Sequence, residues 1–177
     1  MYNFLITYSY IGTFLLMLIE NLFPPIPSEV ILLFSGFLVN KLNLNIVLMI
    51  LVASLGALLG AIILYFIGDK IKFKNLDKAQ EFFSKYGIKT VFLGRFIPIF
   101  RSVISIPAGM FKINFRLFLI YTFLGSIIWN SVLIFLGYIL NDNWYKFTYI
   151  LKKYDLIIIF LVLIFIVVNF FKKQKKS

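Results

Sequence analysis

The chain has 177 residues, of which 62% are hydrophobic and 14% are charged, and its mean hydropathy is +0.97. This composition excludes a soluble domain and indicates a polytopic membrane protein organised as one domain. Histidine and cysteine are absent, which excludes disulfides, Cys/His metal sites and catalysis by a His or Cys nucleophile. The net charge of +11 comes largely from lysines that lie between apolar segments and at the end of the chain. Such lysines indicate anionic lipid headgroups rather than nucleic acid as the partner.

The first apolar segment ends in a proline-rich break. Residues 1–19 carry no charge, and residues 20–29, ENLFPPIPSE, then supply two acids and three prolines. The apolar residues that follow, 30–40, are too few to cross a bilayer, because a transmembrane helix needs about 20 residues. The pattern predicts a helix that enters the membrane and a short helix that returns to the same side. The tip of this hairpin contains Pro24, Pro25 and Pro27.

The middle of the chain alternates between crossings and polar stretches. Residues 42–68 are uncharged and long enough to cross, and Gly56 and Gly60 form a GxxxG pattern that lets another helix approach closely. Residues 71–87 interleave phenylalanines with lysines and acids, which predicts an amphipathic linker helix at the membrane interface. We expect a second crossing over residues 117–140 and a C-terminal transmembrane helix over about 155–172.

A second break occurs at residues 94–109, where two arginines and two prolines lie inside apolar sequence. An arginine at the centre of a transmembrane helix costs about 2.5–3.5 kcal/mol even on lenient scales, so such a residue usually binds something. Broken backbone at that depth requires cover from protein or a water-filled cavity. The pattern predicts a second re-entrant hairpin with Pro98, Pro107 and Gly109 at its tip. The alternative is an ordinary kinked helix whose arginines reach the interface.

The two halves of the chain repeat each other. Residues near the breaks match at an offset of 73 and residues in the crossings match at an offset of 69, as in the pairs Pro25/Pro98, Gly36/Gly109, Gly56/Gly125 and Gly68/Gly137. Each half is one hairpin plus one crossing, so the second half must enter the membrane from the opposite side. The sequence therefore predicts an all-α inverted repeat, with repeat one over about 8–70 and repeat two over about 88–140. Inverted repeats with broken helices indicate a transport site near the midplane.

These motifs resemble the DedA family of membrane proteins. The resemblance covers roughly residues 20–137 and is carried by Glu20-Asn21, the segment PPIPSE at 24–29, the segment RFIPIFRS at 95–102, and Ala108-Gly109. It implies an inner-membrane lipid translocase that moves undecaprenyl phosphate or a phospholipid, with proton coupling. It also implies that Glu20 and Glu29 gate transport or take up protons, and that Arg95 and Arg101 are essential.

The residue chemistry agrees with this function. Arginine presents a fixed fork of donors to a phosphate and keeps its charge, whereas a carboxyl group in a low-dielectric site can exchange protons. We therefore expect Arg95, Arg101 and Ser102 to bind an anionic headgroup, without a cofactor, a metal ion or catalytic residues. Glu29 has a second interpretation, in which it caps the returning helix together with Ser28.

Three other functions stay open at this point. One is a proton-coupled carrier for a small solute or ion, in which arginines and acids neutralise each other until the substrate arrives. Another is an intramembrane enzyme acting on lipid phosphates, with the acids as general base and the arginines as oxyanion clamps. The third is a purely structural membrane protein.

The lysines predict the orientation of the chain. Six lysines occur in the stretch 70–89 and four occur after residue 171. The positive-inside rule places both groups on the cytoplasmic side. We therefore expect a multi-pass protein of the bacterial cytoplasmic membrane with a cytoplasmic C-terminus.

Overall fold

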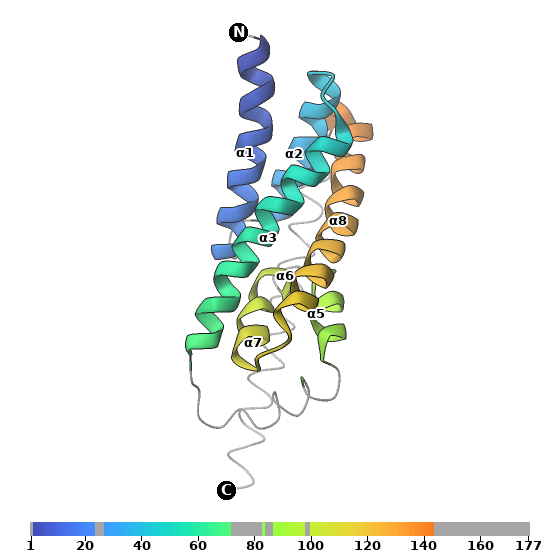
Figure 1. Ribbon diagram of the computed structural model, residues 1–177. Coiled ribbons are helices and arrows are strands. Elements are labelled where there is room, and N and C mark those ends of the chain that lie inside the picture. Colours follow the sequence, from blue (N-terminus) through green and yellow to red (C-terminus); the bar gives the residue numbers. More distant parts are fainter. Residues whose placement is uncertain (1, 24–26, 72–82, 84–86, 98–99, 144–177) are drawn as a thin grey trace, which may run out of the picture.

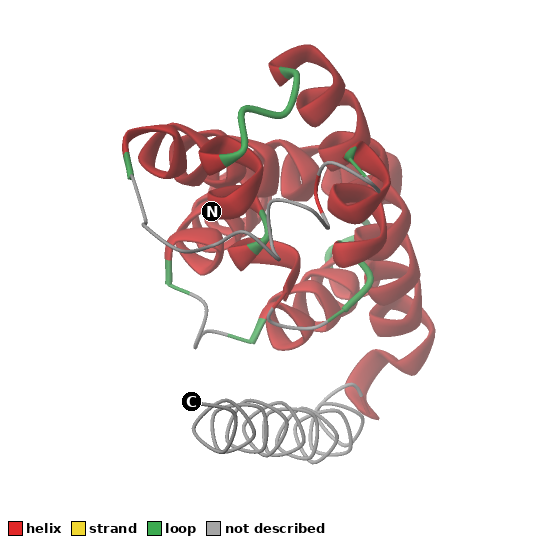
Figure 2. Ribbon diagram, turned by 90° about the horizontal axis from the view of Figure 1, so that it is seen from below, coloured by secondary structure: helices red, strands yellow, loops and turns green. Residues whose placement is uncertain are grey.

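The described part of the chain is entirely helical. The computed structural model describes residues 2–23, 27–71, 83, 87–97 and 100–143, and the side chains from residue 7 onward. These residues form helices joined by short turns (Figures 1 and 2), which confirms the predicted all-α class. In chain order the elements are α1 (Tyr2–Leu22), α2 (Ser28–Lys41), α3 (Ile46–Lys70), α5 (Ile88–Gly94), α6 (Phe100–Val103), α7 (Ser105–Met110), α8 (Phe115–Leu140) and a 3₁₀ turn, η1 (Asn141–Asn143).

Helices α3 and α8 are long enough to cross a membrane. They contain 25 and 26 residues, and at about 1.5 Å per residue each exceeds the hydrocarbon thickness of about 30 Å. Both are also apolar enough to cross a membrane. Both begin in the same way, because the side chains of Asn45 and Asn114 accept hydrogen bonds from the first free backbone N–H groups. The predicted crossings at 42–68 and 117–140 are therefore present as helices.

The first proline-rich break separates α1 from α2. α1 ends at Leu22 and α2 begins at Ser28, after Pro27. Ser28 and Glu29 bond to each other, Ser28 Oγ donating to Glu29 Oε1 at 3.0 Å, and no side-chain capping bond is found at the start of α2. Neither side chain therefore caps α2 with a hydrogen bond, but Glu29 lies in the first turn of α2, where a negative charge is favourable.

The second break differs in detail from its prediction. α5 ends at Gly94, just before Arg95, and α6 and α7 follow as two short helices. Pro107 and Gly109 were expected at the hairpin tip but lie inside α7. Proline is tolerated there because Pro107 occupies the first turn, where a backbone N–H has no intrahelical partner. Gly109 is required for packing instead, since a β-carbon would collide with the backbone of Tyr65 and Asp69 in α3.

The short helix of each half packs against the long helix of the other half. Gly36 in α2 lies directly against the backbone of α8, where a β-carbon would meet Ile134 and Tyr138. Gly109 in α7 has the corresponding position against α3. The contacts are reciprocal, because Gly137 of α8 meets the backbone of Leu33 and Gly68 of α3 meets the backbone of Ile106. Figure 1 shows the result, with α2 beside α8 and α7 beside α3.

The GxxxG pattern of α3 serves the close packing that the sequence predicted. Gly56 lies against the backbone of Phe14 and Gly60 against Leu18 and Asn21, all on α1. Small residues remove the side-chain thickness between two helices and so let their backbones approach. The end of α1, with Glu20 and Asn21, is thereby fixed against the middle of α3.

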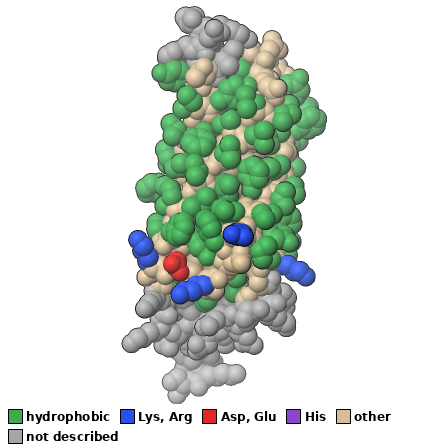
Figure 3. Space-filling model, in the orientation of Figure 1, with side chains coloured by type: hydrophobic (Ala, Val, Ile, Leu, Met, Phe, Trp, Pro, Cys, Tyr) green, Lys and Arg blue, Asp and Glu red, His purple; other side chains and the backbone are tan. Residues whose placement is uncertain are grey.

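The outer surface matches a membrane environment. Large apolar side chains such as Leu55, Phe66, Ile128 and Phe135 are exposed on α3 and α8, and they cover most of the face in Figure 3. A soluble protein rarely exposes an apolar surface of this extent. Parts of the prediction lie outside the described residues. These are most of the linker at 71–87, the C-terminal helix at 155–172, and Pro24, Pro25 and Pro98.

Candidate functional site

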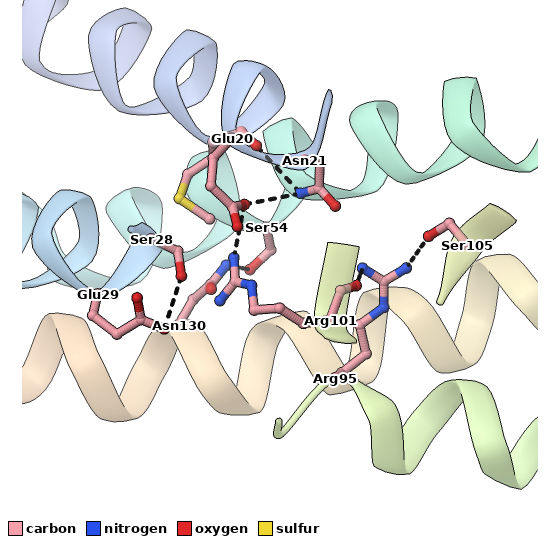
Figure 4. Close-up of polar contacts among 10 residues, drawn as sticks. Glu20, Asn21, Ser28, Glu29, Ser54, Arg95, Arg101, Ser105 and Asn130 are labelled. Atoms are coloured by element: carbon pink, nitrogen blue, oxygen red, sulfur yellow. Dashed lines mark hydrogen bonds and ion pairs between the residues drawn. The ribbon is translucent and has the colours of Figure 1, made fainter. Parts of the chain in front are cut away.

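The four charged residues singled out from the sequence are all buried. Glu20, Glu29, Arg95 and Arg101 are 3%, 6%, 2% and 5% exposed, respectively. They come from the end of α1, the start of α2, the end of α5 and α6, and Figure 4 shows them gathered where these elements meet. Burying an isolated charge is costly unless it is paired and hydrogen-bonded. The partners of each charge therefore indicate its role.

Arg101 forms an ion pair with Glu20. The Nη2 atom of Arg101 lies 3.2 Å from Oε2 of Glu20, and both side chains are almost fully buried. Asn21 Nδ2 donates to the same carboxylate oxygen at 3.3 Å and to the carbonyl oxygen of Met17. The pair joins the first half of the chain to the second, since its members are 81 residues apart.

Arg95 is held by neutral acceptors. Its guanidinium donates to the backbone carbonyl oxygen of Arg101, to Ser105 Oγ at 2.9 Å and to Thr122 Oγ1 at 3.2 Å. Its stem packs against Gly125 of α8. No acid within the described part of the chain forms a salt bridge with Arg95, and its Nε–H has no hydrogen-bond partner there. Arg95 therefore adds a buried positive charge that lacks a direct counter-ion among these residues.

Glu29 and Ser102 have different surroundings. The Glu29 carboxylate accepts a hydrogen bond from Ser28 Oγ, and Glu29 lies near enough to Glu20 for their carboxylates to interact electrostatically. Ser102 is fully buried next to Arg101 on α6. The structure thus brings together Glu20, Arg101 and Arg95 through shared contacts, while Glu29 approaches the group from α2 without an ion pair among the described residues.

Several polar residues of the site were not predicted. Thr122 and Ser105 hold Arg95, and Asn130 Nδ2 donates to Ser54 Oγ at 3.0 Å between α8 and α3. A signal for part of this set was present in the sequence, because Thr122, Ser126 and Asn130 recur every four residues and so share one face of α8. All three are buried. Polar residues on one stripe of an otherwise apolar helix indicate contact with protein rather than lipid.

The arrangement suits reversible binding of an anion. Arg95 Nε–H is a buried donor without a partner in the described structure, so it retains capacity for one more hydrogen bond. The amide oxygens of Asn21 and Asn130 are also without a partner there, but as acceptors they do not bind an anion. Within the same residues, no three acidic, His or Cys side chains are placed to hold a metal ion. The groups of this site that can bind an anion are therefore two buried guanidinium groups, one of which is neutralised by a carboxylate.

Comparison with known proteins agrees with this architecture. Residues 26–139 match the VTT domain. The chain is 33% identical to undecaprenyl phosphate transporter A of Staphylococcus aureus, over 95% or more of both chains (98% and 96%), and 31% identical to the protein of that name in Bacillus subtilis, over 86% and 84%.

A third relative has a different kind of name. The chain is 43% identical to an alkaline phosphatase-like protein of Lactococcus lactis subsp. lactis, with 95% of this chain and 91% of that protein covered. No solved structure matches the chain. Its match to the VTT domain over more than half its length, together with the family motifs at both breaks, shows that the chain is a membrane protein of the VTT-domain, or DedA, family.

Proposed function

We propose that this protein transports a lipid with an anionic phosphate headgroup, undecaprenyl phosphate or a phospholipid, across the bacterial cytoplasmic membrane. The observation that carries the proposal is the buried Arg101 guanidinium, which is neutralised by Glu20 from the other half of the chain. Two relatives that span most of the chain are named undecaprenyl phosphate transporter A, and this supports the choice of substrate.

Exchange of partners at Arg101 is the central step. A phosphate can accept two parallel hydrogen bonds from a guanidinium, so it can replace the Glu20 carboxylate as the anionic partner. Uptake of a proton by Glu20 removes the competing charge and frees Arg101 for the phosphate. Loss of that proton restores the ion pair and releases the headgroup. Transport would then be coupled to protons through Glu20.

The other predicted residues have supporting roles. Arg95 supplies a second positive charge without a direct counter-ion, which raises the attraction for an anion. The hydroxyl group of Ser102 is a donor to the phosphate from the residue next to Arg101. Glu29 places a second acid near Glu20, which gives Glu29 a gating role.

The proposed topology is an inverted repeat of two re-entrant hairpins. It is supported by the reciprocal glycine contacts, in which Gly36 on α8 and Gly109 on α3 keep the offset of 73, while Gly68 and Gly137 keep the offset of 69. The turns before α3 and α8 also correspond, because Asn43 and Lys112, 69 residues apart, both have positive φ. The breaks between the helices would then lie near the midplane, as in other transporters with inverted repeats.

The charged residues at the ends of the bundle favour the predicted orientation. Asp69, Lys70, Lys89, Lys112 and Arg116 are exposed near the end of α3 and the start of α8, and Figure 3 shows charged side chains of both signs gathered at that end, with basic ones in excess. The opposite end carries exposed Lys41 and Asp142. The positive-inside rule then assigns the basic end to the cytoplasm.

Hydrolysis of a lipid phosphate is the second candidate, because one relative is named alkaline phosphatase-like. The described site contains acids and arginines that could act as a general base and oxyanion clamps. Transport of a small solute or ion is the remaining alternative. The three functions differ in what leaves the membrane leaflet. A lipid transporter moves intact lipid to the other leaflet, an enzyme releases inorganic phosphate, and a solute carrier moves no lipid.

Proteoliposomes containing only this protein separate these functions. Labelled undecaprenyl phosphate and a labelled anionic phospholipid are each reconstituted in one leaflet, and their appearance in the other leaflet is followed together with released phosphate. We expect movement of intact lipid, faster with a proton gradient in wild type and insensitive to it in Glu20→Gln. Phosphate release at the rate of lipid loss would establish the enzyme instead. Absence of lipid movement for both substrates would contradict the proposed function.

A further inference from the structure

The helices sort into two groups by the kind of contact between them. Six glycines lie against the backbone of another helix, and each of these contacts joins helices of the same group. We call α1, α3, α6 and α7 the first bundle and α2, α5 and α8 the second bundle. Gly56 and Gly60 join α3 to α1, Gly68 and Gly109 join α3 to α7, and Gly36 and Gly137 join α2 to α8. Each bundle therefore contains helices from both halves of the sequence.

Contacts between the two bundles are made by side chains, many of them polar. Thr13 of α1 meets Ser35 of α2 at 2.9 Å, and Thr13 is the donor because the Ser35 hydroxyl already donates to the carbonyl of Ile31. Ser54 of α3 accepts from Asn130 of α8. Ser105 of α7 accepts from Arg95, which directly follows α5. We call the boundary formed by Thr13, Ser35, Ser54, Asn130, Arg95 and Ser105 the seam.

The seam is buried and keeps free hydrogen-bonding capacity. Its six residues are each 4% exposed or less. Asn130 Oδ1 and Arg95 Nε on the seam have no partner in the described structure. Polar groups at such a position are expensive in apolar surroundings unless something satisfies them. The ion pair of Glu20 with Arg101 belongs to the first bundle, and Arg95 reaches across the seam to the Arg101 carbonyl.

The two kinds of contact respond differently to separation. A glycine packed on backbone leaves a void when the helices part, since no side chain can follow and fill the gap. A hydroxyl or amide pair can exchange its hydrogen bond for one to water or to a phosphate with little net change. The glycine contacts therefore hold α1, α3 and α7 together and α2 and α8 together, while the seam is the boundary that can open.

We propose that the seam is the path of the phosphate headgroup, and that it opens by movement of the two bundles relative to each other. The inference rests on the proposed function and adds the path that the headgroup takes through the protein. The ligand is a phosphate monoester or diester headgroup, received in turn by the hydroxyl and amide groups of the seam and by the Arg101 guanidinium beside it, while its lipid chain stays in the surrounding membrane. The moving parts are the two bundles, which differ from the two repeats of the sequence.

The natural chain contains no cysteine, so cysteine pairs can test the seam directly. The cross-bundle variant is Thr13→Cys/Ser35→Cys. The hydroxyl oxygens of Thr13 and Ser35 lie 2.9 Å apart, so the sulfur atoms that replace them are near enough to be linked. The matched variant within the second bundle is Asn40→Cys/Tyr138→Cys, at positions joined by a hydrogen bond from Asn40 to the Tyr138 carbonyl. Both variants are treated with a short thiol-cleavable cross-linker in proteoliposomes.

We expect cross-linking across the seam to reduce lipid flux at least tenfold relative to the same sample after thiol reduction, which should restore it. Cross-linking within the second bundle should change flux less than twofold. Full flux in the cross-linked seam variant would overturn the proposal.

A second measurement does not depend on transport. Rigid bismaleimides of increasing length are applied to each pair, and we expect the seam pair to react with short and long reagents, whereas the pair within the bundle reacts only with the short ones. An equally narrow range for both pairs would show that the bundles do not separate. Absence of lipid flux in wild type would contradict the proposed function. The lengths of the bismaleimides that react with each pair would still decide whether the seam opens.

Discussion

The two buried arginines are neighbours with opposite surroundings. Arg101 faces a carboxylate, Glu20, from the other half of the chain, whereas Arg95 is surrounded by one carbonyl and two hydroxyl groups. A carboxylate partner can be replaced by a phosphate of similar geometry, whereas neutral acceptors from three elements hold the Arg95 guanidinium in place while the seam is closed. The two arginines of one motif therefore have different proposed roles. Arg101 exchanges its carboxylate partner for the phosphate, whereas Arg95 is a fixed positive charge that attracts the anion.

The largest effect is expected from replacing Glu20. Glu20→Gln leaves the Arg101 charge without its partner, and losing one member of a buried ion pair destabilises proteins by about 3–5 kcal/mol. Thermal unfolding in detergent should show a clear fall in Tm. Glu29→Gln is the matched control and should change Tm much less, because Glu29 has no ion pair in the described structure. The double variant Glu20→Gln/Arg101→Gln should recover much of the stability. Equal losses for the two acids would contradict the assignment of the ion pair.

Arg101→Lys comes next and separates charge from geometry. The ammonium group keeps the charge but cannot form two parallel hydrogen bonds to a phosphate. Loss of a charge-assisted hydrogen bond of about 1.5–3 kcal/mol corresponds to a roughly 10- to 100-fold fall in flux. Arg116→Lys makes the same replacement at an exposed position and should leave flux unchanged. Full flux in Arg101→Lys would reduce Arg101 to a counter-ion.

Thr122→Val tests the positioning role of Arg95. It removes one acceptor of the guanidinium with little change in volume, and an unsatisfied buried donor costs about 1–3 kcal/mol. We expect a several-fold fall in maximal flux, with the lipid concentration at half-maximal flux unchanged, because Arg101 itself is intact. Ser126→Ala is the control one turn further along α8, where the side chain has no hydrogen-bond partner among the described residues. A change confined to the apparent affinity for lipid would instead make Arg95 a direct phosphate ligand.

The smallest effect is expected at Gly125. A β-carbon there would come within 3.1 Å of Cβ and Cγ of Arg95, so Gly125→Ala shifts the arginine stem by a few tenths of an ångström. The gain in helix propensity offsets the crowding, and the net change in stability should stay within about 1 kcal/mol. Gly12→Ala is the control, since nothing lies within 4 Å of its β-carbon position. A lower lipid flux in Gly125→Ala than in Gly12→Ala, at equal Tm, would show that transport depends on the exact position of the Arg95 side chain.

The positions of the breaks, the two long helices and the burial of the charged residues follow from the sequence alone. Prolines, uninterrupted apolar length and helix caps are local properties, so Pro27 and the uncharged stretches of α3 and α8 determine where helices start and stop. The need to cover an intramembrane charge also follows from composition, and it identified Glu20, Glu29, Arg95 and Arg101 before any partner was known.

Only the tertiary structure decided which of these residues meet. The spacing of residues on a helix defines a face but not the helix that this face will contact. Hence the sequence could not tell that Glu20 pairs with Arg101 rather than with Arg95, or that Gly109 packs against α3 instead of marking a hairpin tip. The grouping of the helices into bundles that mix both repeats has the same origin. It depends on contacts between residues far apart in the chain, where backbone shape and free space determine the partner.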